Sequence, residues 1–124
     1  MSTVLIVDDD DVIRKFMRRI VEKEGFDVIE AANGAECLER FRSASPAIVV
    51  MDIIMPEKDG LSTIQELKKL DPQAKVVAIS GGLVMTPEIY LDEAGAIGAD
   101  ILLAKPIDRE QFIAAIRQLL TPAT

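Results

Sequence analysis

The sequence predicts an α/β protein built on a doubly wound parallel sheet. Two observations lead to this fold class. Short apolar runs alternate along the whole chain with longer segments whose apolar residues recur at helical spacing. Several of these runs also stop abruptly at a charged or hydroxyl residue, as parallel strands do when their carboxyl ends meet at one edge of a sheet. The alternation predicts right-handed crossovers and helices on both faces of the sheet.

The first strand is predicted at Val4–Val7, a continuous apolar run that is typical of a strand buried on both faces. A helix follows and is expected to stop at Gly25. Its predicted apolar face consists of Val12, Ile13, Phe16, Met17, Ile20 and Val21. The basic residues of this helix are expected to form an ordinary solvated face; they are Arg14, Lys15, Arg18 and Arg19.

The second strand is predicted at Asp27–Ala31, and Asn33-Gly34 breaks the chain after it. The next helix has a predicted apolar face made of Cys37, Leu38 and Phe41. Ser45-Pro46 is a second break, which separates this helix from a third strand at Ala47–Met51.

After a loop that contains Pro56, a third helix presents the apolar residues Leu61, Ile64, Leu67 and Leu70. The fourth strand is predicted at Lys75–Ile79, and Thr86-Pro87 is typical of the start of a fourth helix. The fifth strand is predicted at Ile101–Ala104. Asp108 is the expected cap of the last helix, whose apolar face consists of Phe112, Ile113, Ile116, Leu119 and Leu120.

Composition and net charge exclude some classes of function. The 124 residues are 49% hydrophobic and 28% charged, which suits a single globular domain spanning residues 1–124. A net charge of −7 argues against nucleic acid as a direct partner. No apolar run approaches the roughly 20 residues of a membrane span, and no basic leader precedes the first strand, so we expect a cytoplasmic protein without a membrane partner.

Polar residues follow four of the predicted strands and are expected to converge at one edge of the sheet: Asp8, Asp9, Asp52, Ser80 and Lys105. Oxygen ligands suit a hard cation such as Mg²⁺, and a chain with no histidine and one cysteine serves softer metals poorly. A cation and Lys105 on opposite sides would favour phosphoryl transfer, with Asp52 as the nucleophile. Asp10 and Asp11 are expected to open the first helix.

The chain resembles the receiver domains of two-component response regulators over essentially its whole length. The segments that carry the resemblance are Val4–Asp9, Val50–Gly60, Ala78–Gly82, Gly98–Asp100 and Ala104–Pro106. The resemblance implies a flavodoxin-like (βα)5 fold with strand order 2-1-3-4-5. It also implies a signalling module rather than a dedicated enzyme, one that promotes its own phosphorylation and dephosphorylation. A separate output protein, or an effector domain outside this sequence, would read the switched surface.

The same resemblance implies a role for each site residue. Asp52 would accept phosphate from the phosphohistidine of a sensor kinase or of a histidine phosphotransfer protein. The Mg²⁺ ligands would be Asp9, Asp52 and the Ile54 backbone carbonyl, with Asp8 acting through water. The phosphoryl oxygens would be contacted by Ser80 and Lys105, and the Lys105-Pro106 bond would be cis.

The sequence departs from the family pattern in three places. Leu102 occupies the position of the usual switch aromatic, and the stretch from Ser80 to Lys105 is a few residues longer than in compact members. Ile54 and Gly82 flank the expected site and are both non-polar, so neither side chain can hold an attacking water. We therefore predict a long-lived aspartyl phosphate.

Two alternatives remain open at this point. Asp8–Val12 also fits the D-x-D-x-V signature of haloacid-dehalogenase-like phosphatases, in which Asp8 would be the nucleophile. The second alternative is an interaction domain that has kept the fold and works without phosphate. Labelling with a small phosphodonor separates these alternatives, because each predicts a different labelled residue or no label.

Overall fold

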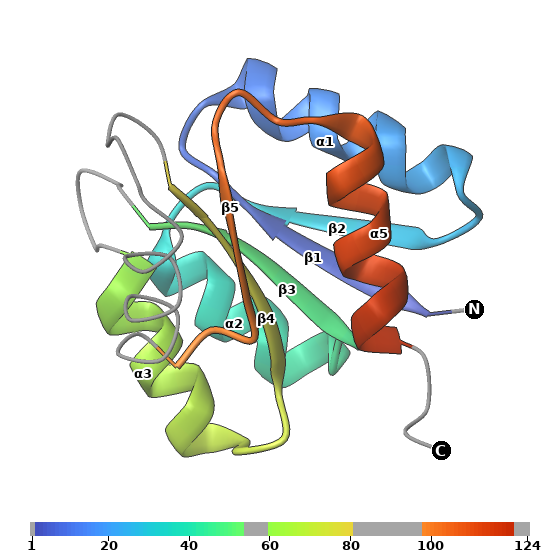
Figure 1. The fold of residues 1–124 in the computed structure, drawn as a ribbon. Coiled ribbons are helices and arrows are strands. Elements are labelled where there is room, and N and C mark those ends of the chain that lie inside the picture. The colour runs from blue at the N-terminus through green and yellow to red at the C-terminus, as the bar shows by residue number, and fades with distance from the viewer. Residues whose placement is uncertain (1, 54–59, 81–97, 121–124) are drawn as a thin grey trace.

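A parallel sheet forms the centre of the molecule, with helices on both of its faces (Figure 1). The computed structural model describes residues 2–53, 60–80 and 98–120. Within these ranges the strands are β1 (Thr3–Val7), β2 (Asp27–Ala31), β3 (Ile48–Asp52), β4 (Lys75–Ser80) and β5 (Ile101–Ala104). Their order is β2-β1-β3-β4-β5, with every pair parallel, which confirms the predicted fold class and strand order.

The described helices are α1 (Asp11–Lys23), α2 (Gly34–Ala44), α3 (Gly60–Leu70) and α5 (Arg109–Leu120). The fourth helix, predicted to begin at Thr86-Pro87, lies outside the described residues. Three helix starts have side-chain caps: Asp10 and Asp108, where the sequence predicts helix starts, and Asn33, which the sequence indicates only as a break. The N–H of Val12 donates to Asp10 Oδ1 at 2.9 Å, that of Glu36 to Asn33 Oδ1 at 2.9 Å, and that of Gln111 to Asp108 Oδ1 at 3.0 Å.

Alternating residues of the strands divide the core into two layers. Leu5, Val49 and Val76 pack with the α2 and α3 side chains Cys37, Phe41, Ile64 and Leu67. Their neighbours Val4, Ile48 and Val77 pack with the α1 and α5 side chains Met17, Ile20, Phe112 and Ile116. Both faces of each central strand are therefore buried, which explains why the strands appear in the sequence as continuous apolar runs.

Two expectations for α1 are wrong, and both concern the direction in which its side chains point. Val12 and Phe16 were predicted on the apolar face but are 77% and 49% exposed, whereas Arg14 was predicted to be solvated and is 9% exposed. At about 100° per residue, Val12 and Phe16 lie about 140° and 100° around the helix from the buried Met17, and Arg14 only about 60°. The buried stripe of α1 therefore includes the arginine.

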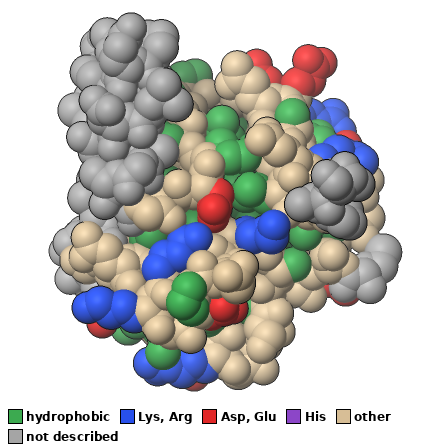
Figure 2. Space-filling model, turned by 60° about the horizontal axis from the view of Figure 1, so that its bottom comes forward, with side chains coloured by type: hydrophobic (Ala, Val, Ile, Leu, Met, Phe, Trp, Pro, Cys, Tyr) green, Lys and Arg blue, Asp and Glu red, His purple; other side chains and the backbone are tan. Residues whose placement is uncertain are grey.

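Figure 2 shows the molecule turned so that the lower end in Figure 1 comes forward. Charged side chains are dispersed on this face. There, described Lys and Arg side chains lie singly or in small groups, with acidic side chains and exposed hydrophobic ones among them (Figure 2). This face carries no basic patch of the kind that nucleic-acid binding requires among the residues described.

Candidate functional site

The carboxyl ends of the strands bring the predicted site residues together. Val7 pairs with Met51 in the parallel register, so Asp8 and Asp52 follow on neighbouring strands. Ser80 is the last residue of β4 and pairs with Ala104, which places Lys105 immediately beyond it. The backbone N–H of Lys105 donates to the Ser80 carbonyl at 2.8 Å and extends the ladder by one residue. Strand register alone therefore gathers four segments that are distant in the sequence.

Three carboxylates form a cluster at this edge. Each of Asp8, Asp9 and Asp52 offers one oxygen, and these oxygens lie within 4.8 Å of one another. Asp8 is fully buried and Asp52 is 3% exposed, whereas Asp9 is exposed and opens the cluster to solvent. Like charges this close repel one another strongly in a partly buried site, so the cluster favours a positive ion.

The cost of burying charge in this cluster is clearest in the pKa of Asp8. Burial raises the pKa of its carboxyl from 3.8 to about 6, and the nearby charges of Asp52 and Asp9 act in the same direction. The hydrogen bond from the Asp10 N–H to Asp8 Oδ1, at 2.9 Å, and the charge of Lys105 only partly offset this rise. Asp8 Oδ2 is buried and has no hydrogen-bond partner among the described residues.

Lys105 supplies the positive charge on the other side of the cluster. Its Nζ lies 3.4 Å from Asp52 Oδ2 and 3.6 Å from Asp8 Oδ2. Burial disfavours the ammonium, but the carboxylates of Asp52 and Asp8 outweigh this and raise the pKa of Lys105. The lysine is therefore a fixed cation over the neutral pH range, and the Lys105-Pro106 bond is cis as predicted.

Ser80 and Gly60 are two further described residues at this edge of the sheet. Ser80 is 3% exposed, and its Oγ has no hydrogen-bond partner within residues 2–53, 60–80 and 98–120. Gly60 begins α3 directly against the end of β3, where an added Cβ would lie 2.4 Å from the Asp52 carbonyl oxygen. Only a glycine lets the helix start this close to the strand. The predicted ligand Ile54 and the flanking Gly82 lie outside the described residues.

The chemistry of the cluster fits a hard divalent cation. All its ligand atoms are carboxylate oxygens, and the chain has no histidine that would favour a softer metal. The described site can therefore hold a metal ion through Asp8, Asp9 and Asp52, opposite an ammonium that can meet an anion.

Arg14 is a component of this region that the sequence did not reveal. Its NH1 donates to the Asp8 carbonyl at 2.7 Å, and its Nε donates to Glu30 Oε1 at 2.8 Å. The sequence does contain one signal for it. Glu30 is a carboxylate inside an otherwise mostly apolar strand, so it needs a basic partner, and α1 offers several basic residues. Leu102, at the position of the usual aromatic, is partly buried and packs on the α2 and α3 side of the core.

The fold and this site define a class of proteins: doubly wound α/β domains with a carboxylate cluster and a lysine at the ends of their parallel strands. The chain belongs to the response regulator receiver domain family, whose model matches residues 4–117. The predicted family is therefore confirmed, and the phosphatase alternative is not favoured.

Relatives support this assignment over nearly the full length of the sequence. The chain is 36% identical to chemotaxis protein CheY of Bacillus subtilis, with 94% of this chain and 96% of that protein covered. It is 37% identical to the CheY of Thermotoga maritima, with 94% and 95% covered. The NtrX receiver domain of Brucella abortus superposes with a TM-score of 0.86 at 29% identity, covering 97% of this chain and 99% of that one.

The same domain also matches a part of a longer protein. The chain is 32% identical to the transcriptional regulatory protein CpxR homolog of Haemophilus influenzae, of which it covers 51%. Receiver domains are signalling domains rather than dedicated enzymes, and they interact with histidine kinases and with output partners. None of the described helices has the length and apolar character needed to span a membrane.

Proposed function

We propose that Asp52 accepts a phosphoryl group from the phosphohistidine of a sensor histidine kinase or of a histidine phosphotransfer protein, with Mg²⁺ bound at the carboxylate cluster. The observation that carries this proposal is the position of the Asp52 carboxylate. One of its oxygens belongs to the acidic cluster, and Oδ2 lies 3.4 Å from Lys105 Nζ. A nucleophile between a cation site and an ammonium is suited to a phosphoryl group whose oxygens gather negative charge during transfer.

Each residue has a distinct task in the proposed transfer. An Asp52 carboxylate oxygen attacks phosphorus, the bond from phosphorus to the histidine nitrogen breaks, and its electron pair leaves with the imidazole. The Lys105 ammonium and the Ser80 hydroxyl contact the phosphoryl oxygens. The buried Ser80 Oγ has no hydrogen-bond partner among the described residues, which supports this role.

The proposed cation site uses Asp9, Asp52 and the Ile54 carbonyl as direct ligands, with Asp8 acting through water. When bound, Mg²⁺ would neutralise the carboxylates and the developing charge on the phosphoryl oxygens. In the same way the chain would promote its own phosphorylation and, more slowly, its own dephosphorylation.

The proposed output is a change of surface near β5 and the predicted fourth helix, which a separate protein or an effector domain reads. The net charge of −7 and the dispersed basic side chains support a protein partner over direct contact with nucleic acid. A cytoplasmic location and a single domain spanning residues 1–124 are part of this proposal.

The test is labelling of the purified chain with acetyl phosphate and Mg²⁺, followed by intact-mass measurement. We expect the mass of one phosphoryl group to be added, and chelation of Mg²⁺ to prevent it. Borohydride reduction converts an aspartyl phosphate to homoserine, and peptide mapping should place this change at residue 52.

Three variants distinguish the proposal from its alternatives. Asp52→Asn should abolish labelling, whereas Asp8→Asn should retain it at high Mg²⁺. Loss of label in Asp8→Asn but not in Asp52→Asn would instead support a phosphatase that uses Asp8. A natural chain that gains no mass would support an interaction domain that works without phosphate. Lys105→Met should slow labelling without preventing Mg²⁺ binding, because the lysine contacts the phosphoryl group and not the metal.

A further inference from the structure

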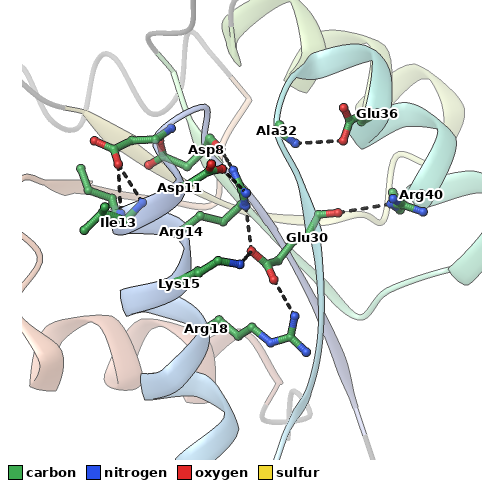
Figure 3. A network of polar contacts seen from close by, with 12 residues as sticks. Asp8, Asp11, Ile13, Arg14, Lys15, Arg18, Glu30, Ala32, Glu36 and Arg40 are labelled. Carbon is green, nitrogen blue, oxygen red and sulfur yellow. Dashed lines mark hydrogen bonds and ion pairs between the residues drawn. The ribbon is translucent and has the colours of Figure 1, made fainter.

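Arg14 connects three elements beneath the acidic cluster. Its guanidinium donates to the Asp8 carbonyl at 2.7 Å and to Glu30 Oε1 at 2.8 Å, and it also pairs with Asp11 (Figure 3). These partners are the residue that follows β1, a residue of β2 and a residue of the first turn of α1. The arginine is 9% exposed, so its charge is held almost entirely by these groups. It contacts none of the carboxylate oxygens of the metal cluster itself.

The contact of interest is the one with a backbone carbonyl. The Asp8 carbonyl belongs to the peptide group that joins Asp8 to Asp9, the two acidic neighbours of the cluster. The other peptide group of Asp8 is also fixed, because its N–H donates to the Ala31 carbonyl of β2 at 3.2 Å. Fixing both peptide groups fixes the backbone dihedrals of Asp8, which aim its carboxylate, and it also sets the direction in which the chain enters Asp9.

The arginine is itself held firmly. Glu30 is braced by Arg18, whose NH1 contacts its other carboxylate oxygen, and Lys15 Nζ lies 3.9 Å from Glu30 Oε1 (Figure 3). Burial disfavours the Arg14 charge, but hydrogen bonds and charge from Glu30 and Asp11 outweigh it and raise its pKa. A planar guanidinium can satisfy three partners at once in a fixed geometry, which a lysine cannot do.

We propose that Arg14 is a positioning residue for the cation site: it holds the Asp8–Asp9 peptide group against β2 and thereby presents both carboxylates to the metal. The inference rests on the proposed function, because it concerns the same cluster. Groups that orient metal ligands typically affect metal affinity by about 10- to 100-fold when removed. Arg14 acts on the ligands through the backbone and does not contact the phosphoryl group.

The test compares Arg14→Met with Arg18→Met, because both remove an arginine that binds Glu30 and only the first removes the hydrogen bond to Asp8. Mg²⁺ binding is measured by calorimetry, and unfolding in urea measures stability separately. We expect the Mg²⁺ dissociation constant to rise about tenfold in Arg14→Met and less than twofold in Arg18→Met. An unchanged constant in Arg14→Met, or an equal rise in both variants, would overturn the proposal.

Labelling with acetyl phosphate gives a second readout that a purely structural role would not move. In Arg14→Met the Mg²⁺ concentration for half-maximal labelling should rise by the same factor as the dissociation constant, while the rate at saturating Mg²⁺ stays within about twofold. A fall in the saturated rate with unchanged half-saturation would contradict positioning of the metal ligands. If the natural chain takes no label, the proposed function fails, while the calorimetric comparison still decides the role of Arg14.

Two conservative variants keep the test decisive if Arg14→Met does not fold. Arg14→Lys retains the charge but can reach only one of the partners, so it should weaken Mg²⁺ binding by a smaller factor. Glu30→Gln keeps an acceptor for Arg14 but removes the opposite charge, and a still smaller effect is expected. Mg²⁺ affinity equal to that of the natural chain in both variants would reject the proposal.

Discussion

The two ends of the sheet differ in how their polar side chains are paired. At the amino ends of β4 and β5, Asp100 Oδ2 accepts from the Val76 N–H at 2.8 Å and from Lys68 Nζ at 3.1 Å. Lys68 also donates to the Ala74 carbonyl. At the carboxyl ends, Asp8 Oδ2 and Ser80 Oγ are buried without a hydrogen-bond partner in the described part of the chain.

The difference indicates what each end is for. A buried polar group without a partner costs about 1 to 3 kcal/mol, so the carboxyl ends lower the stability of the metal-free protein. The amino ends use the same types of side chain, a lysine and a carboxylate, in a set of contacts that stabilises the strand starts. Asp8 Oδ2 and Ser80 Oγ therefore lie where a metal and an anion can supply the partners that the described residues do not.

The largest expected loss of stability is at Gly60, which makes the tightest contact at the carboxyl ends of the strands. Gly60→Ala would place a Cβ 2.4 Å from the Asp52 carbonyl oxygen and 2.5 Å from Ile53 Cα. Both neighbours are backbone and cannot move aside cheaply, so we expect a loss of about 3 kcal/mol or more in the free energy of unfolding, measured in urea. Gly25→Ala is the control, because its Cβ meets nothing within 4 Å and only the positive φ of 92° opposes it. Equal losses in the two variants would show that the contact at Asp52 is not tight.

The next effect follows from the charge of Asp8. Its pKa is about 6 in the folded protein and 3.8 ordinarily, so the ionised carboxyl destabilises the fold above pH 6. This penalty, on the order of 3 kcal/mol, should decline as the pH falls from about 6 to 4, because the folded chain then binds the proton more tightly than the unfolded chain.

Asp8→Asn should therefore raise the melting temperature of the metal-free protein at pH 7.5, and the difference from the natural chain should shrink at pH 4.5. Added Mg²⁺ should stabilise the natural chain more than the variant. A constant difference across this pH range would mean that Asp8 ionises normally in the folded protein.

A smaller loss of stability is expected at the amino ends of β4 and β5. Asp100→Ala removes the acceptor of the Val76 N–H and of Lys68, and these groups are partly exposed to water. We expect a loss of about 1 to 2 kcal/mol in unfolding free energy. Mg²⁺ affinity and labelling at Asp52 should not change, and a change in either would show that the two ends of the sheet are coupled.

The smallest effect concerns the lifetime of the phosphorylated state. Ile54 and Gly82 offer no side-chain hydrogen bond to an attacking water, so the aspartyl phosphate should survive well beyond seconds in purified protein with Mg²⁺. Ile54→Asn should accelerate hydrolysis several-fold, equivalent to about 1 kcal/mol in the barrier. Loss of the label is followed by intact-mass measurement over time, and hydrolysis within seconds in the natural chain would contradict the prediction.

The sequence by itself determined the fold class and the positions of most site residues. Strands buried on both faces must be continuously apolar, so their ends are visible where a charged or hydroxyl residue follows, as at Asp8 and Ser80. Capping also follows local rules, which is why Asp10 and Asp108 were found as helix starts. These features depend on a few neighbouring residues and on the general geometry of parallel sheets.

Only the tertiary structure decided which α1 side chains are buried and how far the pKa of Asp8 is shifted. Helical spacing alone could not show that Phe16 faces solvent while Arg14 lies beneath the cluster, because β2 supplies Glu30 from a different part of the chain. The raised pKa of Asp8 likewise depends on burial and on Asp52, a residue of another strand. Electrostatic interactions act between neighbours in space, and those neighbours exist only after the sheet has formed.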